Sequence, residues 1–100
     1  MQTSITEQDG LYVVSLEGRL DTAAAPQTER ELSSLYTCSG KDIILDCAQL
    51  EYISSSGLRI FLGILKNAKS KGQQVQIQNI NDDLRKIFVI TGFANLFGLK

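Results

Sequence analysis

The run Asp42-Ile43-Ile44-Leu45-Asp46-Cys47, followed by a helical pattern from about Ser55 to Lys71, decides the fold of this 100-residue chain. The run is apolar, flanked by polar residues and too short for a helix, so it predicts a strand buried on both faces. In the second segment, apolar residues recur at helical spacing and predict a core stripe made by Leu58, Phe61, Leu62 and Leu65. Lys71-Gly72 ends the predicted helix.

Two strands are predicted upstream, at about Ser4 to Glu7 and Leu11 to Glu17. Asp9-Gly10 lies between them and predicts a tight hairpin, because both residues tolerate positive φ. Gly18-Arg19-Leu20-Asp21 interrupts the strand pattern. The chain is therefore expected to open with an antiparallel pair.

The other elements are predicted from residues typical of helix starts and helix ends, and from the alternation of apolar and polar residues. In chain order they are a helix from near Ala23-Ala24-Ala25-Pro26-Gln27 to Ser39-Gly40, a half-exposed strand from Gln73 to Gln78 near an edge, and a helix from Asn81 to Gly92. The apolar tail from Phe93 to Lys100 is expected to pack back on the core. The order β-β-α-β-α-β-α predicts one α/β domain over residues 1–100. Its sheet should be mixed, mostly parallel and about four to five strands wide, with helices packed against it.

Composition excludes several classes of function. The net charge of −1 supplies no basic field for nucleic acid or anionic lipid. The chain contains no histidine, which removes Ser-His-Asp and Cys-His catalysis and the commonest metal ligand, so no catalytic residue, metal or cofactor is expected. No apolar run is long enough to span a bilayer, and the N-terminus does not read as a signal peptide. We therefore expect a cytoplasmic protein in which Cys38 and Cys47 are free thiols.

The segment from Glu51 to Arg59 links the predicted third strand to the second helix and holds three consecutive serines. Serines at a helix start can cap free backbone N–H groups, which is the structural interpretation. Gly57 is harder to explain by capping, because glycine costs about 1 kcal/mol relative to alanine inside a helix. We expect it where something must approach the backbone closely. A helix N-terminus also suits a phosphate, so a phosphoserine here is the functional interpretation.

Four pieces of the sequence at compatible spacing resemble one known family. They are Tyr52-Ile53-Ser54-Ser55-Ser56-Gly57-Leu58-Arg59, Gly18-Arg19-Leu20-Asp21 followed by alanines, Ile44-Leu45-Asp46, and Leu84-Arg85-Lys86 through Thr91-Gly92-Phe93-Ala94-Asn95-Leu96-Phe97. Over essentially the whole chain the sequence resembles the STAS domains of the anti-sigma factor antagonist family.

The resemblance implies a non-enzymatic bacterial phosphoprotein that regulates transcription. Such proteins bind an anti-sigma factor with GHKL-type serine kinase activity and so free a sigma factor. The kinase phosphorylates a serine at the start of the second helix, which separates the complex, and a PP2C-type phosphatase reverses the modification. Here the resemblance implies phosphorylation of Ser56, next to Gly57, or of Ser55. Ser54 stands where many members of the family carry aspartate, and a serine cannot copy a carboxylate that orients the acceptor hydroxyl.

Partner contacts are expected from Asp21 and from the helix start, that is from Ser54, Ser55, Ser56, Gly57, Leu58, Arg59 and Ile60. Two alternatives remain open. Asp21 could cap the first helix with Thr22, in place of a partner contact or together with it. Ile60 and Ile64 could widen the core stripe or form the apolar centre of a docking surface beside Arg59.

A second hypothesis from a different class is a STAS subunit that is never phosphorylated. Such a subunit would act as a scaffold in a lipid-transport or stress-sensing complex. In either case we expect a monomer that makes no direct contact with nucleic acid. Transfer of a phosphate from a kinase and ATP separates the two hypotheses.

Overall fold

The computed structural model describes residues 1–37, 40–95 and 98–99, and within these residues the chain forms one five-stranded mixed sheet. The strands lie side by side in chain order: β1 (Gln2–Gln8), β2 (Leu11–Leu20), β3 (Asp42–Ile53), β4 (Val75–Gln78) and β5 (Gly98–Leu99). β1 pairs with β2 antiparallel, and all other neighbours are parallel. This arrangement confirms the predicted mixed, mostly parallel sheet.

The hairpin between β1 and β2 turns at Asp9 and Gly10, as predicted. Both residues have positive φ, 51° and 77°, which suits the two-residue turns that join twisted antiparallel strands. Gln8 pairs with Leu11 across this turn.

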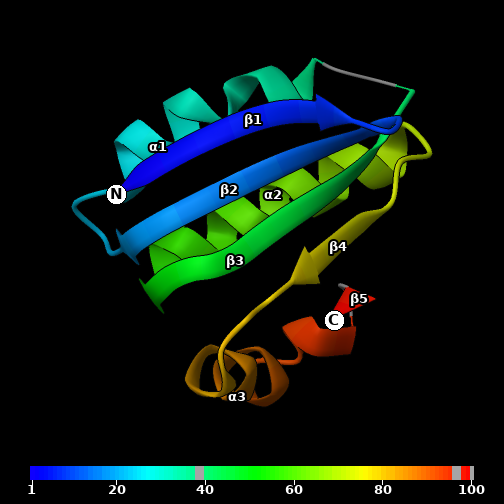
Figure 1. The fold of residues 1–100 in the computed structure, drawn as a ribbon. Helices are drawn as coiled ribbons and strands as arrows, with labels where there is room; N and C mark the ends of the chain where they lie inside the picture. The colour runs from blue at the N-terminus through cyan, green and yellow to red at the C-terminus, as the bar shows by residue number, and fades with distance from the viewer. Residues whose placement is uncertain (38–39, 96–97, 100) are drawn as a thin grey trace.

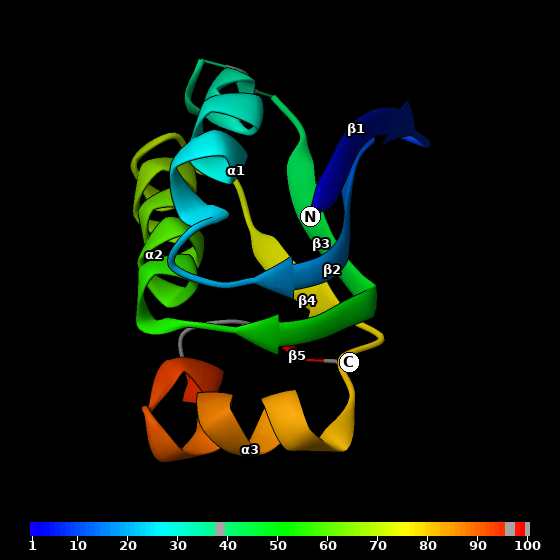
Figure 2. The same ribbon diagram turned by 90° about the vertical axis from the view of Figure 1, so that its left-hand side faces the viewer.

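The helical segments are α1 (Ala25–Glu31), η1 (Ser33–Tyr36), α2 (Ser55–Ser70), α3 (Asp82–Ile90) and η2 (Phe93–Asn95). Figures 1 and 2 show α1 and α2 on the same face of the sheet, whereas α3 lies at the end of the sheet formed by β4 and β5. Phe61 of α2 and Phe88 of α3 join these parts, with ring centroids 6.1 Å apart.

Because α1 and α2 cover one face, β3 is buried mainly on that face. Ile43, Leu45 and Cys47 are buried, whereas Ile44 and Asp46 are half-buried and point the other way. The prediction of a strand buried on both faces is therefore wrong. The opposite face of the sheet, its open face, is covered by neither α1 nor α2 (Figure 2).

Two strands run further than predicted, because each passes an irregularity. β2 continues through Gly18, whose φ of 104° accompanies a register shift, to Leu20. β3 continues past Asp46 to Ile53, and the Asp46 carboxylate accepts hydrogen bonds from the Ala48 backbone N–H (3.0 Å) and the Asn79 side chain (3.1 Å). Both strands therefore end beside the start of α2.

The first helix is shorter than predicted. α1 ends at Glu31, and the separate turn η1 follows, held by Lys71, whose Nζ donates to the carbonyls of Leu35 (3.2 Å) and Tyr36 (3.3 Å). The predicted end at Ser39-Gly40 falls partly on residues outside the described ranges.

The last elements agree more closely with the predictions. In β4, Val75 and Ile77 are buried, whereas Gln76 and Gln78 are half-buried, which confirms the predicted alternation. Gly98 and Leu99 pair with β4 as β5, so this part of the tail does return to the sheet.

Candidate functional site

The serine segment lies where β2 and β3 end and α2 begins. The backbone N–H of Ser54 donates to the carbonyl of Leu20, the last residue of β2, at 2.8 Å. The Ser54 hydroxyl accepts from the Gly57 N–H at 3.2 Å, and the Ser54 carbonyl accepts from the Leu58 N–H at 2.9 Å. Ser54 is thus the N-cap of α2 and is 9% exposed. Capping is confirmed for this serine, and serine is as suitable for that role as aspartate.

Ser55 and Ser56 are the first two residues of α2 and are placed differently from Ser54. Ser55 is exposed and Ser56 half-buried. Neither hydroxyl makes a hydrogen bond to another described residue, so both are chemically available. Two of the three serines therefore do not serve as caps.

The electrostatics of this helix start favour an added negative charge. The first turn of α2 contains no acidic side chain, whereas the first turn of α3 contains Asp82 and Asp83. The free N–H groups of a helix start carry a partial positive charge. In α3 this charge faces carboxylates, and in α2 it faces the two free serine hydroxyls.

Gly57 is required by packing inside the protein. A Cβ built on it would lie 2.7 Å from Leu20 Cγ and 2.8 Å from Ile53 Cγ1, and both of these side chains are buried. The expectation that something approaches this backbone closely is correct, but the approaching groups are the last residues of β2 and β3. No ligand or partner is needed to explain the glycine.

Asp21 follows Leu20 and is half-buried beside the serine segment. Its Oδ1 accepts from the Ala24 N–H at 2.8 Å, and its carbonyl accepts from the Ala25 N–H at 3.1 Å. The carboxylate therefore has a structural role in the turn into α1, but not the role of helix cap that was expected. The N-cap of α1 is Ala24, without a side-chain cap, so Asp21 holds the turn before the helix and does not cap the helix itself. Thr22 makes no hydrogen bond within the described part of the chain.

A groove between α1 and α2 contains Ser56. It has a volume of about 330 Å³ and is lined by Thr22, Ala25, Pro26, Glu29, Ser56 and Arg59. Ser56 and Arg59 come from α2, and the other lining residues come from α1 and the turn before it. The groove therefore brings one free hydroxyl together with one cation and one carboxylate.

Two residues expected on the docking surface lie in the core. Leu58 is 8% and Ile60 5% exposed, and Ile64 is also buried. Because Ile60 and Ile64 are both buried, the structure favours the interpretation that they widen the core stripe. Leu62, predicted in the core stripe, is only half-buried. Arg59 is exposed, as a docking residue should be.

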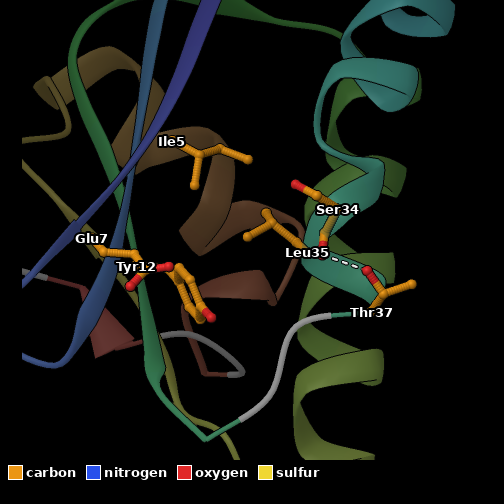
Figure 3. A pocket seen from close by; sticks show the side chains of 6 residues that line it. All are labelled: Ile5, Glu7, Tyr12, Ser34, Leu35 and Thr37. Atoms are coloured by element: carbon orange, nitrogen blue, oxygen red, sulfur yellow. Dashed lines mark hydrogen bonds between the residues drawn. The ribbon is translucent and has the colours of Figure 1, made fainter.

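A larger cavity, of about 430 Å³, lies near the other end of β2 and was not predicted from the sequence. Figure 3 shows its lining, Ile5, Glu7, Tyr12, Ser34, Leu35 and Thr37. Lys41 forms an ion pair with Glu7, and its ammonium lies 5.3 Å from the centroid of the Tyr12 ring. The residues around this cavity come from β1, β2, η1 and the connection that follows η1, so no local motif could indicate the cavity.

Other chemistry is sparse in the described part of the chain. Cys47 is a free thiol, as expected, and burial raises its pKa to about 12, so it stays protonated and unreactive near neutral pH. Cys38 lies outside the described residues. Residues 1–37, 40–95 and 98–99 contain no cluster of three or more potential metal ligands. No helix in these ranges is long and apolar enough to cross a membrane.

Comparison with known proteins gives a consistent assignment. The family model of the STAS domain matches residues 2–100. The anti-sigma-B factor antagonist of Staphylococcus aureus is 31% identical over 91 residues, covering 91% of this chain and 84% of that protein. BtrV of Bordetella bronchiseptica is 30% identical over 97 residues, covering 97% of this chain and 84% of BtrV.

A solved structure, the Bacillus cell fate determinant SpoIIAA in its phosphorylated form, superimposes with a TM-score of 0.74. It is 21% identical and covers 99% of this chain and 91% of that one, so this likeness concerns the fold. The family model and the two sequence relatives carry the assignment. The chain belongs to the STAS domain family, in which its sequence relatives include anti-sigma factor antagonists.

Proposed function

We propose that this chain is an anti-sigma factor antagonist that is switched off by phosphorylation at Ser56. Without phosphate it binds an anti-sigma factor with GHKL-type serine kinase activity in the cytoplasm and frees a sigma factor. With phosphate it dissociates, and a PP2C-type phosphatase restores it. Family membership supports the class of partner, because the relative from Staphylococcus aureus is named an anti-sigma-B factor antagonist.

One observation carries the choice of Ser56: a free hydroxyl lies at an uncompensated helix start and also lines a groove. Ser54 is a poor site for phosphorylation, because the residue is only 9% exposed and its hydroxyl oxygen accepts a hydrogen bond from the Gly57 N–H. Ser55 is exposed, but it is not among the residues that line the groove beside Arg59. Ser55 is therefore the second choice.

The charge of a phosphate explains how the switch would act. A phosphoserine carries about −1.5 to −2 charges at neutral pH. At Ser56 this charge would meet the N–H groups of α2 and Arg59, so the folded protein accepts it. A partner seated on the groove would have to desolvate the phosphate, and a partner carboxylate there would be repelled. The docking face, which we define as Asp21, Ser55, Ser56 and Arg59, would lose its complementarity.

Intact-mass analysis after incubation with a GHKL-type anti-sigma kinase of the same genome and ATP tests this proposal. We expect the wild type and Ser55→Ala to gain the mass of one phosphate, and Ser56→Ala to gain none. In a binding titration without ATP, Ser56→Ala should bind like the wild type, and Ser56→Asp should bind at least about tenfold more weakly.

Two outcomes would contradict the proposal. If the kinase modifies Ser56→Ala but does not modify Ser55→Ala, the phosphorylated residue is Ser55 and not Ser56. A wild type that binds the kinase but is never modified would favour the scaffold hypothesis. Ser54→Ala is not a suitable control, because removing the N-cap weakens the helix itself.

A further inference from the structure

Arg19 and Tyr52 form an exposed pair beside the docking face. They are direct neighbours in the register of β2 and β3, and the Arg19 guanidinium lies 4.5 Å from the centroid of the Tyr52 ring. Tyr52 is 38% exposed, and among the described residues only Val89 and Ile90 are other large hydrophobic side chains with comparable or greater exposure. Those two lie at the end of α3.

The pair lies on the open face of the sheet. Successive side chains of a strand point to opposite faces, and the next residues, Leu20 and Ile53, are buried against Gly57 of α2. Arg19 and Tyr52 must therefore point away from α2. Figure 2 shows that α1 and α2 lie on the other side of the sheet, so neither of these helices covers the pair.

The pair is also continuous with the docking face along both strands. Arg19 is two residues before Asp21, and Tyr52 is two residues before the N-cap Ser54. The hydrogen bond from the Ser54 N–H to the Leu20 carbonyl ties the two strand ends together. A partner that reaches the docking face from the ends of these strands therefore meets the pair at the rim of the open face.

The chemistry of the pair suits a protein partner. Arginine and tyrosine are enriched at the centres of protein interfaces, and an Arg–aromatic contact gains strength when it is desolvated. A guanidinium placed over a ring keeps N–H donors along its edge, and Arg19 forms no ion pair with any described residue. That edge can bind a carboxylate in a bidentate manner.

We propose that Arg19 and Tyr52 are a second anchor for the same anti-sigma factor, outside the phosphorylated groove. The partner places a carboxylate against Arg19 and an apolar side chain over the Tyr52 ring. This inference rests on the proposed function for the identity of the partner. Because the anchor does not include Ser56, it adds the same increment of affinity to the free and the phosphorylated protein.

Titrations with the purified anti-sigma kinase test the anchor. We expect Tyr52→Ala and Arg19→Glu each to weaken binding about tenfold, as hot-spot residues do. Tyr52→Phe keeps the ring and should bind like the wild type. Ile90→Ala removes an exposed apolar side chain on α3 and is the matched control, with no expected effect. Combined with Ser56→Asp, Tyr52→Ala should cause the same fold-loss as it does alone.

The outcomes separate this inference from the proposed function. If Ser56→Asp weakens binding but Tyr52→Ala and Arg19→Glu bind like the wild type, the anchor is refuted and the switch stands. If the wild type does not bind the kinase, the proposed function fails and the anchor fails with it. Circular dichroism checks folding, and Arg19→Glu remains decisive if Tyr52→Ala does not fold.

Discussion

At the scale of single residues, the three serines of the serine segment have the same side chain but different structural roles. Ser54 is buried and caps α2, whereas Ser55 and Ser56 keep free hydroxyls one and two positions further along. The sequence alone shows that three serines begin a helix, but not which of them is the cap. The identity of the cap depends on where the backbone enters the helix. Here the hydrogen bond from the Ser54 N–H to the Leu20 carbonyl fixes that point.

Gly57 gives the first prediction at this scale. Replacing it with alanine should lower the free energy of unfolding by about 1–3 kcal/mol, because a Cβ would overlap two core side chains. The better helix propensity of alanine, about 1 kcal/mol, offsets part of this loss. Urea unfolding measures the change, and Ser56→Ala, one position away, should stay within about 0.5 kcal/mol of the wild type.

The same variant separates packing from partner approach as the reason for the glycine. If packing is the reason, folded Gly57→Ala is still phosphorylated. A variant as stable as the wild type that the kinase cannot modify would instead show that the kinase needs the bare backbone.

At the scale of elements, sequence patterns predicted the type of most segments but not their ends. The hairpin at Asp9-Gly10 and helix α2 were predicted because local rules decide them. β2 and β3 were predicted too short, because each contains a register shift that breaks the two-residue alternation. Their extension to Leu20 and Ile53 builds the site, and pairing between distant segments determines it. The Arg19–Tyr52 contact likewise becomes visible only once that register is known.

The contact between η1 and α2 gives a prediction at this scale. A Cβ on Gly63 of α2 would lie 2.7 Å from the Tyr36 hydroxyl oxygen but 3.8 Å from the ring carbon that carries it. Removing that hydroxyl should therefore make room for a methyl group. In Tyr36→Phe, the change Gly63→Ala should stabilise the protein by about 1 kcal/mol, the gain in helix propensity.

In the wild-type background the same Gly63→Ala change should gain less or destabilise the protein. A double-mutant cycle of thermal or urea unfolding measures this coupling. Equal effects in both backgrounds would mean that η1 moves aside without a loss of stability. In that case η1 is only loosely packed on α2.

At the scale of the whole molecule, the site lies at the ends of β2 and β3, two neighbouring interior strands of the sheet. Leu20 and Ile53, the last residues of β2 and β3, are 0% and 3% exposed, so the platform under the serines is rigidly packed. A charge added at Ser56 changes the surface of such a platform without refolding it. The switch we propose therefore changes only the local surface around Ser56, and the partner responds to the change in charge there.

Stability measurements on charge variants test whether the switch is local. Ser56→Asp should raise the free energy of unfolding by about 0.3–1 kcal/mol over Ser56→Asn, because the two side chains have similar shapes and only aspartate compensates the start of α2. Glu29 across the groove reduces this gain and Arg59 adds to it, so Glu29→Gln should enlarge the difference. Adding salt should shrink it, since the charges are partly exposed. If Ser56→Asp is instead less stable than Ser56→Asn by more than about 1 kcal/mol, the added charge disrupts the start of α2. The partner would then respond to a loosened helix, and the proposal that the switch acts by charge alone would be wrong.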